Sequence, residues 1–416
     1  MMIAGPLSDA ANSAARWAIE RMSDRDPDAP LCAYVYDLDA LRRHVGDIGS
    51  KLPSFCRMYY AMKANSEDVL LRAIRPHVHG FEAASIGEVR KAFAVDRDVP
   101  VIFGGPGKTD GELREALRSG VERIHVESMH ELRRLGRIAE EEGREATVLL
   151  RVNVKSDLPS ATLQMGGKPT QFGMEESDLP SAAECLRRSP KLRMAGFHLH
   201  SLSNQLSADD HLALISFYWR KTEEWSAKHG LNRSIINAGG GIGVSYSEDI
   251  PQFEWEKFAD GLHRLGDSWH REGKEPPRID FECGRYLTAL CGVYAAEVID
   301  VKKNHGRTYA IIRGGTHQFR LPSSWKHNHP YRIVPIDSWP YPFERPAAAD
   351  EEVTVVGQLC TPKDVLSEDV KVHLLRVGDV ILFVLAGAYG WSISHHDFLS
   401  HPHPEVVFIS SSTRVR

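Results

Sequence analysis

Four short segments of the sequence carry side chains that could take part in chemistry. Lys63 follows the β-rich run 58–62, three consecutive glycines stand at 239–241, and Glu282 and Arg285 close another apolar run. A lysine at the end of a buried strand is partly desolvated and can act as an amine nucleophile. A glycine run lets backbone N–H groups approach a phosphate. Each feature also has a plainer interpretation, namely a solvated surface lysine and a tight turn.

Glu282 lies between apolar residues, so we expect its carboxylate to point into the protein interior. A buried carboxylate needs a cationic or N–H partner. That partner could be an internal arginine such as Arg151, or it could be the protonated ring nitrogen of a bound cofactor.

Two histidines, His198 and His200, stand two positions apart at the end of a further β-rich run. Alternate residues of a strand face the same side, so both rings would point the same way. One imidazole could stack on a flat cofactor ring, although a hydrogen-bonded core histidine is the commoner role. We expect no metal here, because neither a cysteine nor a group of carboxylates stands nearby in the sequence.

The elements that would position these groups follow from an alternation of β-rich runs with amphipathic helical windows. About eight such runs occur, at 58–62, 80–84, 101–104, 124–127, 147–154, 194–200, 234–238 and 279–282. The pairs Ser85/Glu88, Thr109/Glu112 and Ser128/Glu131 have the spacing of capping boxes and start three of the helical windows. The alternation predicts an α/β fold, a (β/α)8 TIM-like barrel whose chemistry lies at the carboxyl ends of the strands.

After residue 285 the pattern changes to β-rich segments with weak helical periodicity. Val293–Lys302 and Thr308–Arg313 flank Asn304-His305-Gly306, which predicts a β-hairpin. We expect an N-terminal segment 1–36 that contributes to the β domain, a barrel over 37–285 and a mostly β C-terminal domain over 286–416. The stretch 314–349 is rich in Pro, Trp and His and is expected to form a long loop.

The composition bounds the class of protein. The chain has 416 residues, a formal net charge of −5 and six cysteines without a C-x-x-C pair. A mildly acidic chain is a poor candidate for nucleic-acid binding, and scattered thiols indicate a reducing compartment. No apolar run has the length of a membrane span, and residues 1–20 lack the pattern of a secretory signal. We therefore expect a cytoplasmic protein with neither a nucleic-acid nor a membrane partner.

In combination, these segments would supply a nucleophilic amine, a flat aromatic platform, a phosphate cradle and a carboxylate for a ring nitrogen. Pyridoxal 5′-phosphate requires this set of groups. In an eight-stranded barrel the phosphate site commonly follows the seventh and eighth strands, which is where the glycine run 239–241 and Arg285 stand. The sequence therefore predicts a pyridoxal-phosphate enzyme.

The motifs resemble those of the fold-type III pyridoxal-phosphate decarboxylases, the alanine racemase-like fold of diaminopimelate and ornithine decarboxylases. The resemblance extends from about Tyr34 to about Ile409. It implies that Lys63, in Tyr60-Ala61-Met62-Lys63-Ala64-Asn65, holds the cofactor as an imine. The cofactor-binding residues expected with it are Glu82, Arg151, His200, Ser203, Gly239, Gly240, Gly241, Glu282, Gly284, Arg285 and Tyr389.

In the C-terminal domain, the resemblance implies that Cys360 and Asp364 are donated across the interface of a homodimer with shared active sites. The block from 314 to 329 resembles a narrower subgroup, the siderophore-biosynthesis decarboxylases that act on amino acids joined to citrate. Its cationic and hydrogen-bonding side chains would suit a small substrate with several carboxylates, of the citryl-diaminopropionate type. The predicted substrate-binding residues are His317, Arg320, Cys360 and Asp364.

The sequence departs from the family pattern at three positions. Leu202 stands where the family often has glycine, Cys283 where it often has proline, and Thr361 where an acidic residue often follows the interface cysteine. The last departure argues against an ordinary diamino-acid substrate.

The predicted reaction is loss of an α-carboxylate, with Lys63, His200, Glu282 and Cys360 as the catalytic residues. Glu282 would keep the ring nitrogen protonated, so that the cofactor accepts the electron pair left on Cα. Racemases of this fold place an arginine opposite that nitrogen, so Glu282 favours decarboxylation over racemisation. Cys360 is the candidate acid that reprotonates Cα.

Four alternatives stay open at this point. Two are decarboxylases, one acting on diaminopimelate in lysine biosynthesis and one acting on an amino acid tethered to a carrier protein. The others are a racemase, which Glu282 disfavours, and a cofactor-homeostasis protein of the same barrel type. Proteins of that last kind lack a β domain, whereas this chain has about 130 residues after the barrel.

Overall fold

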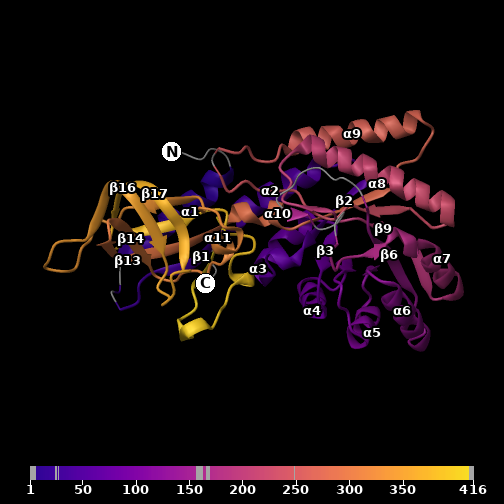
Figure 1. The fold of residues 1–416 in the computed structure, drawn as a ribbon, viewed down its shortest axis with the longest axis horizontal. Helices are drawn as coiled ribbons and strands as arrows, with labels where there is room; N and C mark the ends of the chain where they lie inside the picture. The colour runs from indigo at the N-terminus through magenta and orange to yellow at the C-terminus, as the bar shows by residue number, and fades with distance from the viewer. Residues whose placement is uncertain are drawn as a thin grey trace. The chain divides into compact units, whose positions relative to one another are not determined.

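The chain divides into two compact units. The computed structural model describes residues 6–23, 26, 28–155, 163–164, 169–247 and 249–411. The first five residues of the N-terminal segment predicted over 1–36 lie outside this described part of the chain. One unit, called here the β unit, comprises Met1–His44, Ser245–Ile250 and Leu287–Arg416, and the barrel unit comprises Val45–Val244 and Pro251–Tyr286 (Figure 1). Among the described residues, no helix is both long enough and apolar enough to cross a lipid bilayer.

The barrel unit is built on eight parallel strands that close into a ring. Their order is β5-β4-β3-β2-β12-β11-β9-β6, and pairing of β6 with β5 completes the circle. The strands are β2 (Cys56–Ala61), β3 (Gly80–Ala83), β4 (Val101–Phe103), β5 (Arg123–Val126), β6 (Ala146–Asn153), β9 (Leu192–His198), β11 (Ile235–Asn237) and β12 (Arg278–Cys283). Each of the eight predicted runs is one of these strands, so the predicted (β/α)8 barrel is confirmed.

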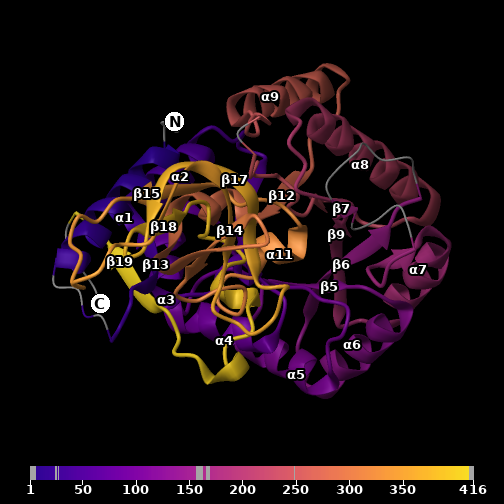
Figure 2. The same cartoon turned by 60° about the vertical axis from the view of Figure 1, so that its left-hand side comes forward.

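Helices cover the outside of the barrel strands (Figure 2). They are α3 (Asp68–Ile74), α4 (Ile86–Val95), α5 (Asp110–Ser119), α6 (Met129–Glu141), α7 (Leu179–Arg188), α8 (Ala208–His229) and α9 (Trp255–Arg271). The hydroxyl groups of Ser85, Thr109 and Ser128 accept the N–H of the residue three positions on, which fixes the starts of α4, α5 and α6 as predicted. Of these three, only Thr109/Glu112 closes the reciprocal box, because the other two glutamates accept the N–H of Ala84 and Glu127 instead.

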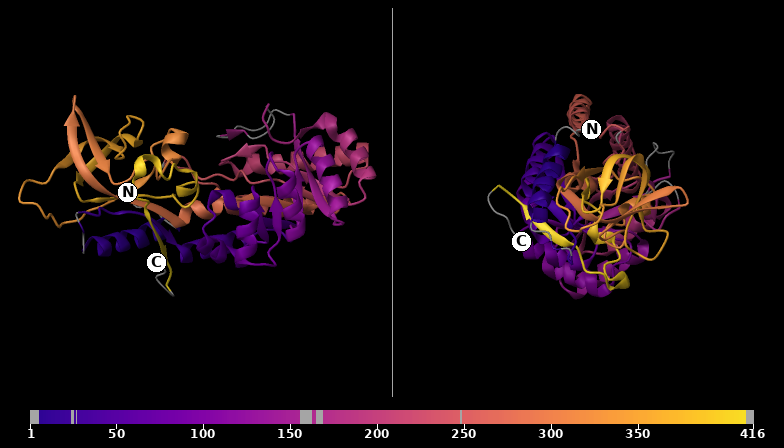
Figure 3. Two further views of the ribbon diagram at one scale, coloured as in Figure 1. Left: turned by 90° about the horizontal axis from the view of Figure 1, so that it is seen from below. Right: turned by 90° about the vertical axis from the view of Figure 1, so that its left-hand side faces the viewer.

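The β unit contains an eight-stranded sheet. Its main path is β15-β18-β13-β14-β16-β17, and β1 pairs with both β13 and β19. The strands are β1 (Cys32–Asp37), β13 (Gly292–Asn304), β14 (Arg307–Ile312), β15 (Tyr331–Val334), β16 (Ala347–Val356), β17 (Val365–Arg376), β18 (Val380–Phe383) and β19 (Glu405–Ile409). Helix α1 (Pro6–Ser23) lies along this sheet, where Ala14 and Ala18 pack with Val35, Val293 and Leu382 (Figure 3).

The predicted hairpin after the barrel is confirmed. Strands β13 and β14 pair antiparallel up to Asn304 and Arg307. The two turn residues between them, His305 and Gly306, have φ angles of 48° and 80°. Positive φ at both positions is the geometry whose twist matches that of the flanking strands.

The stretch 314–349 is not one long loop, so that prediction is wrong. It contains a short helix, α11 (Leu321–Trp325), and strand β15, which pairs antiparallel with β18. The many Pro, Trp and His residues of this stretch hide the strand pattern. Pairing with a partner strand about 50 residues away in the sequence decides its structure.

Candidate active site

The predicted amine lies at the carboxyl end of a barrel strand. Lys63 belongs to a 3-10 turn, Met62–Ala64, that directly follows β2. Its Nζ is 3.7 Å from Oε2 of Glu82, which stands beside Ala61 on the neighbouring strand β3. The Lys63 side chain is 46% exposed, whereas that of Glu82 is only 5% exposed. Burial raises the pKa of Glu82 to about 7, with Lys63 lowering it and Glu282 raising it further.

Glu282 is the penultimate residue of β12, and its carboxylate is buried inside the barrel. Its Oε1 accepts a hydrogen bond from Nδ2 of Asn237 at 2.7 Å. The same asparagine accepts the N–H of Gly239 through Oδ1 at 2.8 Å, and the Glu282 N–H donates to the Gly239 carbonyl at 2.8 Å. These bonds hold the ends of β11 and β12 together and orient one side of the carboxylate.

Two buried histidines lie close to the two oxygen atoms of the Glu282 carboxylate. Nδ1 of His125, on β5, is 3.5 Å from Glu282 Oε1, and Nε2 of His198, on β9, is 3.4 Å from Oε2. The centres of the two rings are 4.2 Å apart. Burial holds the pKa of both histidines well below the usual range, so each is a neutral imidazole at neutral pH.

The cations that surround this cluster are each paired with another carboxylate. Arg151 forms an ion pair with Glu127 at 2.8 Å, so this arginine is not the partner of Glu282 that the sequence left open. Arg123 pairs with Asp280 at 2.7 Å and Lys108 with Glu131 at 2.7 Å. Within the described residues, no lysine or arginine forms an ion pair with Glu282.

The glycine run forms a backbone surface beside the predicted ring platform. Gly239 and Gly241 have φ angles of 66° and 88°, a region that glycine adopts without strain. A Cβ on Gly239 would collide with the ring of His200, and one on Gly241 would collide with the carbonyl of Leu202. The absence of side chains here lets the glycine run and the segment after β9 approach each other closely.

Hydrogen bonds join the segment after β9 to the glycine run 239–241 and the residues that follow it. The N–H of Gln205 donates to the carbonyl of Gly241 at 2.7 Å, and the N–H of Gly243 donates to Gln205 at 2.8 Å. Ser203 lies two residues earlier, in a short strand, β10 (Leu202–Ser203). Gly284 and Arg285 follow β12 directly and are both buried. The predicted phosphate ligands of the barrel unit therefore stand at the carboxyl ends of β9, β11 and β12.

These features fit pyridoxal 5′-phosphate. A half-exposed lysine amine, a buried carboxylate with only neutral partners, a histidine ring against bare glycine backbone and a buried arginine are the groups the cofactor needs. Burial also holds the pKa of His200 well below its usual range, as expected for a ring that stacks in its neutral form.

The remaining predicted residues lie in the β unit. Cys360 is exposed in the loop between β16 and β17. Asp364, in the same loop, is buried and accepts the Leu359 N–H at 2.9 Å and the N–H and hydroxyl of Thr316 at 2.6 and 2.7 Å. Asp364 thus fixes the loop that carries Cys360.

His317 is fully buried in the β unit, and neither of its ring nitrogens has a hydrogen-bond partner among the described residues. Burial lowers its pKa to about 4, and its ring centre lies 5.2 Å from that of His401. Arg320 is exposed, and its backbone N–H donates to Ser394. Tyr389 adopts a φ angle of 53°.

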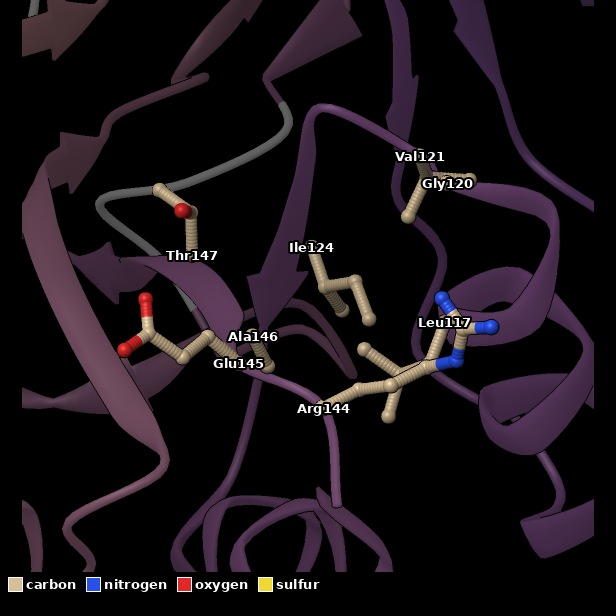
Figure 4. A pocket seen from close by; sticks show the side chains of 8 residues that line it. All are labelled: Leu117, Gly120, Val121, Ile124, Arg144, Glu145, Ala146 and Thr147. Atoms are coloured by element: carbon tan, nitrogen blue, oxygen red, sulfur yellow. The ribbon is translucent and has the colours of Figure 1, made fainter. Parts of the chain in front are cut away.

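A pocket lies at the amino ends of the barrel strands, whereas the predicted cofactor-binding residues of the barrel unit lie at the carboxyl ends. It is lined by Leu117, Gly120, Val121, Ile124, Arg144, Glu145, Ala146 and Thr147, at the amino ends of β5 and β6 (Figure 4). None of the predicted site residues lines it.

Sequence reasoning did not connect three residues, Asn237, His125 and His198, with Glu282. Asn237 ends β11 two residues before the glycine run, and this place at a strand end was a usable signal. His125 had no such signal, and His198 was read as a candidate for stacking or a plain core histidine. Nitrogen and oxygen atoms of His125, His198 and Glu282 lie within 4.8 Å of one another, an arrangement that could also hold a metal ion. The sequence pointed to no metal because these residues are far apart along the chain.

Comparisons with known proteins agree with this geometry. Residues 38–289 match the family described as pyridoxal-dependent decarboxylase, pyridoxal binding domain. The chain is 50% identical to the 2-((L-alanin-3-ylcarbamoyl)methyl)-2-hydroxybutanedioate decarboxylase of Staphylococcus aureus over 92% of this chain and 95% of that protein. It is 32% identical to the Niallia circulans decarboxylase of an L-glutamyl-acyl-carrier protein, over 89% of this chain and 87% of the other.

A solved structure shares the fold. The crystal structure of a point mutant of diaminopimelate decarboxylase from Helicobacter pylori, complexed with L-lysine, superposes with a TM-score of 0.81. The match covers 95% of this chain and 94% of that one at 24% sequence identity. Sequence and fold together place the chain in the family of pyridoxal-dependent decarboxylases, as an amino-acid decarboxylase of fold type III.

Proposed function

We propose that the chain removes the α-carboxylate of an amino acid joined through an amide to a citrate skeleton, in the assembly of a carboxylate siderophore. The observation that carries this proposal is the 50% identity, over 92% of the chain, with a decarboxylase whose name describes such a compound. The more distant relatives act on a carrier-bound glutamyl group or on diaminopimelate, so these are the competing substrate classes.

The barrel unit would hold the cofactor. Lys63 supplies the amine that binds its aldehyde, and Glu82 holds that amine at the strand end. His200 would lie against the ring, while the glycine run, Ser203 and Arg285 would bind the phosphate. Glu282 holds a proton at the ring nitrogen.

When bound, pyridoxal phosphate supplies an electron sink for the pair left on Cα as CO2 departs. Cys360 then donates the proton that replaces the carboxylate at Cα. Its loop is fixed by Asp364, whose carboxylate accepts hydrogen bonds from the backbone N–H groups of Leu359 and Thr316.

Nitrogen-bearing groups of the β unit support a polycarboxylate substrate. Nη1 of Arg313 donates to Oε1 of Gln358 at 2.9 Å, and the Gln358 amide contacts the His401 ring. His317 lies beside His401 with its ring nitrogens unbonded among the described residues. Such groups can donate to carboxylate oxygens, so we place the citrate-derived part of the substrate here and at Arg320.

A substrate panel tests the proposal. CO2 release is measured with the purified holoenzyme on citryl-diaminopropionate, meso-diaminopimelate, ornithine, arginine and a glutamyl-acyl-carrier protein. The expected result is a kcat/KM for the citryl compound at least about 100-fold above the others, since several charged contacts distinguish it. Preference for any other member of the panel would replace the proposed substrate.

We further infer that the enzyme is a homodimer in which Cys360 and Asp364 of one chain serve the lysine of the other. Mixing Lys63→Ala with Cys360→Ala chains tests this, because random reassortment would restore about a quarter of the normal activity in shared sites. If each chain formed its own site, the mixture would stay as inactive as the two separate variants.

A further inference from the structure

The cofactor pocket contains two buried histidines to which the reaction described above gives no role. His125 is 0% exposed and His198 4% exposed, and both nitrogens of each ring lack a hydrogen-bond partner among the described residues. Burying polar nitrogens without partners costs free energy. Their presence at the centre of the barrel therefore calls for a function.

Geometry links both rings to Glu282. Strand alternation places Arg123 and His125 on the same face of β5, and Asp280 and Glu282 on the same face of β12. The layer below Glu282 is closed by the Arg123–Asp280 pair at 2.7 Å. In the layer of Glu282 itself, His125 and His198 stand 3.5 and 3.4 Å from its two oxygens. Hydrogen bonds at catalytic sites are often long in the absence of ligand and shorten in the complex.

The charge state of the partners matters as much as their position. A lysine or arginine beside Glu282 would orient the carboxylate, but it would also cancel the negative charge that a protonated ring nitrogen needs. Arg151 and Lys108 form their ion pairs with Glu127 and Glu131 instead. Among the described residues, the groups in contact with the Glu282 carboxylate are the amide of Asn237 and the two neutral imidazoles of His125 and His198.

We propose that His125 and His198 are positioning residues for Glu282. Each donates one N–H, from Nδ1 of His125 and Nε2 of His198, to a different carboxylate oxygen. With the Asn237 bond they fix the carboxylate in one orientation and leave its charge available to the cofactor's ring nitrogen. The inference concerns the cofactor pocket and holds for any substrate of the enzyme.

The test replaces the donors and observes the cofactor directly. His125→Leu and His198→Leu remove the N–H groups, whereas His125→Asn and His198→Gln retain an N–H near the position of Nδ1 or Nε2. His211→Asn is the matched control, since His211 is an equally buried histidine of the barrel unit that contacts Phe253 and Phe258 instead. Each holoenzyme is prepared with pyridoxal phosphate isotope-labelled at the ring nitrogen, and the NMR shift of that nitrogen reports its protonation.

The leucine variants should shift the ring nitrogen toward its deprotonated form, as is also expected of Glu282→Gln, and should lower kcat more than they raise KM. The Asn and Gln variants should restore the normal shift, and His211→Asn should not change it. A normal ring-nitrogen shift in both leucine variants, or in Glu282→Gln, would overturn the proposal. So would a stoichiometric metal ion in the purified holoenzyme, because His125 and His198 would then be its ligands.

If the leucine variants fail to fold, the wild-type holoenzyme decides the question. With isotope-labelled histidine, His125 should appear as the neutral tautomer protonated at Nδ1 and His198 as the one protonated at Nε2. A charged imidazolium at either position, or the opposite tautomers, would refute the assigned donors.

Discussion

Nζ of Lys63 lies 3.7 Å from Oε2 of Glu82, with the lysine half exposed at the mouth of the barrel and the glutamate buried behind it. The pair places an accessible amine at the end of β2, next to a buried carboxylate. Because β2 and β3 are neighbouring parallel strands, their register sets this distance.

Lys63→Ala should abolish covalent attachment of the cofactor, because no other amine would occupy that position. Borohydride reduction followed by peptide mass spectrometry should find pyridoxyl-lysine at residue 63 in the wild type and none in the variant. Lys91→Ala, at an exposed lysine that donates hydrogen bonds to Ser66, should keep the adduct. An adduct persisting in Lys63→Ala on another lysine, with normal activity, would contradict the assignment.

Glu282→Gln should reduce kcat by at least about 100-fold, the scale of losing one group that stabilises charge in the transition state. The affinity for pyridoxal phosphate should fall much less, because the phosphate and lysine contacts remain. Steady-state CO2 release and fluorescence titration of the apoenzyme measure the two effects. Equal activity of the variant would exclude the role given to Glu282.

Cys360→Ala should slow turnover by roughly 100-fold, as expected when a positioned general acid is removed. Cys360→Ser, a weaker acid of similar size, should restore only part of the rate. Cys185, half-buried on α7 in the barrel unit, provides the control, and Cys185→Ala should behave as the wild type. If Cys360→Ala gave clean product at the normal rate, another group would be the donor of the proton to Cα.

Asp364→Ala should lower the free energy of unfolding by about 2–4 kcal/mol, because three donors from Thr316 and Leu359 would lose a buried charged acceptor. Urea unfolding of the holoenzyme measures this. Asp337→Ala, at a side chain that is 99% exposed, should stay within about 0.5 kcal/mol of the wild type. An unchanged stability in Asp364→Ala would mean that these bonds contribute little to the loop.

Stability should fall on acidification in the window between about pH 6.5 and pH 4. Burial lowers the pKa of His211 to about 4, below its value of 6.5 in the unfolded chain. The unfolded state therefore binds a proton that the folded state does not, and the free energy of unfolding decreases as the pH falls. His211→Asn should reduce this decrease by on the order of 3 kcal/mol.

His305→Asn, at the exposed hairpin turn, is the control for the acid window and should keep the full pH dependence. Unfolding curves at several pH values supply the comparison. An identical pH dependence in His211→Asn and the wild type would show that His211 takes up its proton without unfolding.

Local patterns in the sequence sufficed for the barrel and for the residues at its strand ends. Buried parallel strands read as apolar runs, and the capping residues Ser85, Thr109 and Ser128 mark helix starts within a few positions of them. Lys63, the glycine run and Glu282 follow such runs directly, so their place at the carboxyl ends was predictable. The hairpin at His305-Gly306 was predictable for the same reason, because its turn chemistry is local.

The partners of those residues were decided by tertiary structure alone. His125, His198 and Glu282 come from β5, β9 and β12, and only closure of the ring brings three distant strands to one layer. The ion pair of Arg151 with Glu127 and the pairing of β15 with β18 likewise depend on which strands are neighbours in space. A side chain's charge and partners follow from distances in space, and separation along the chain does not determine those distances.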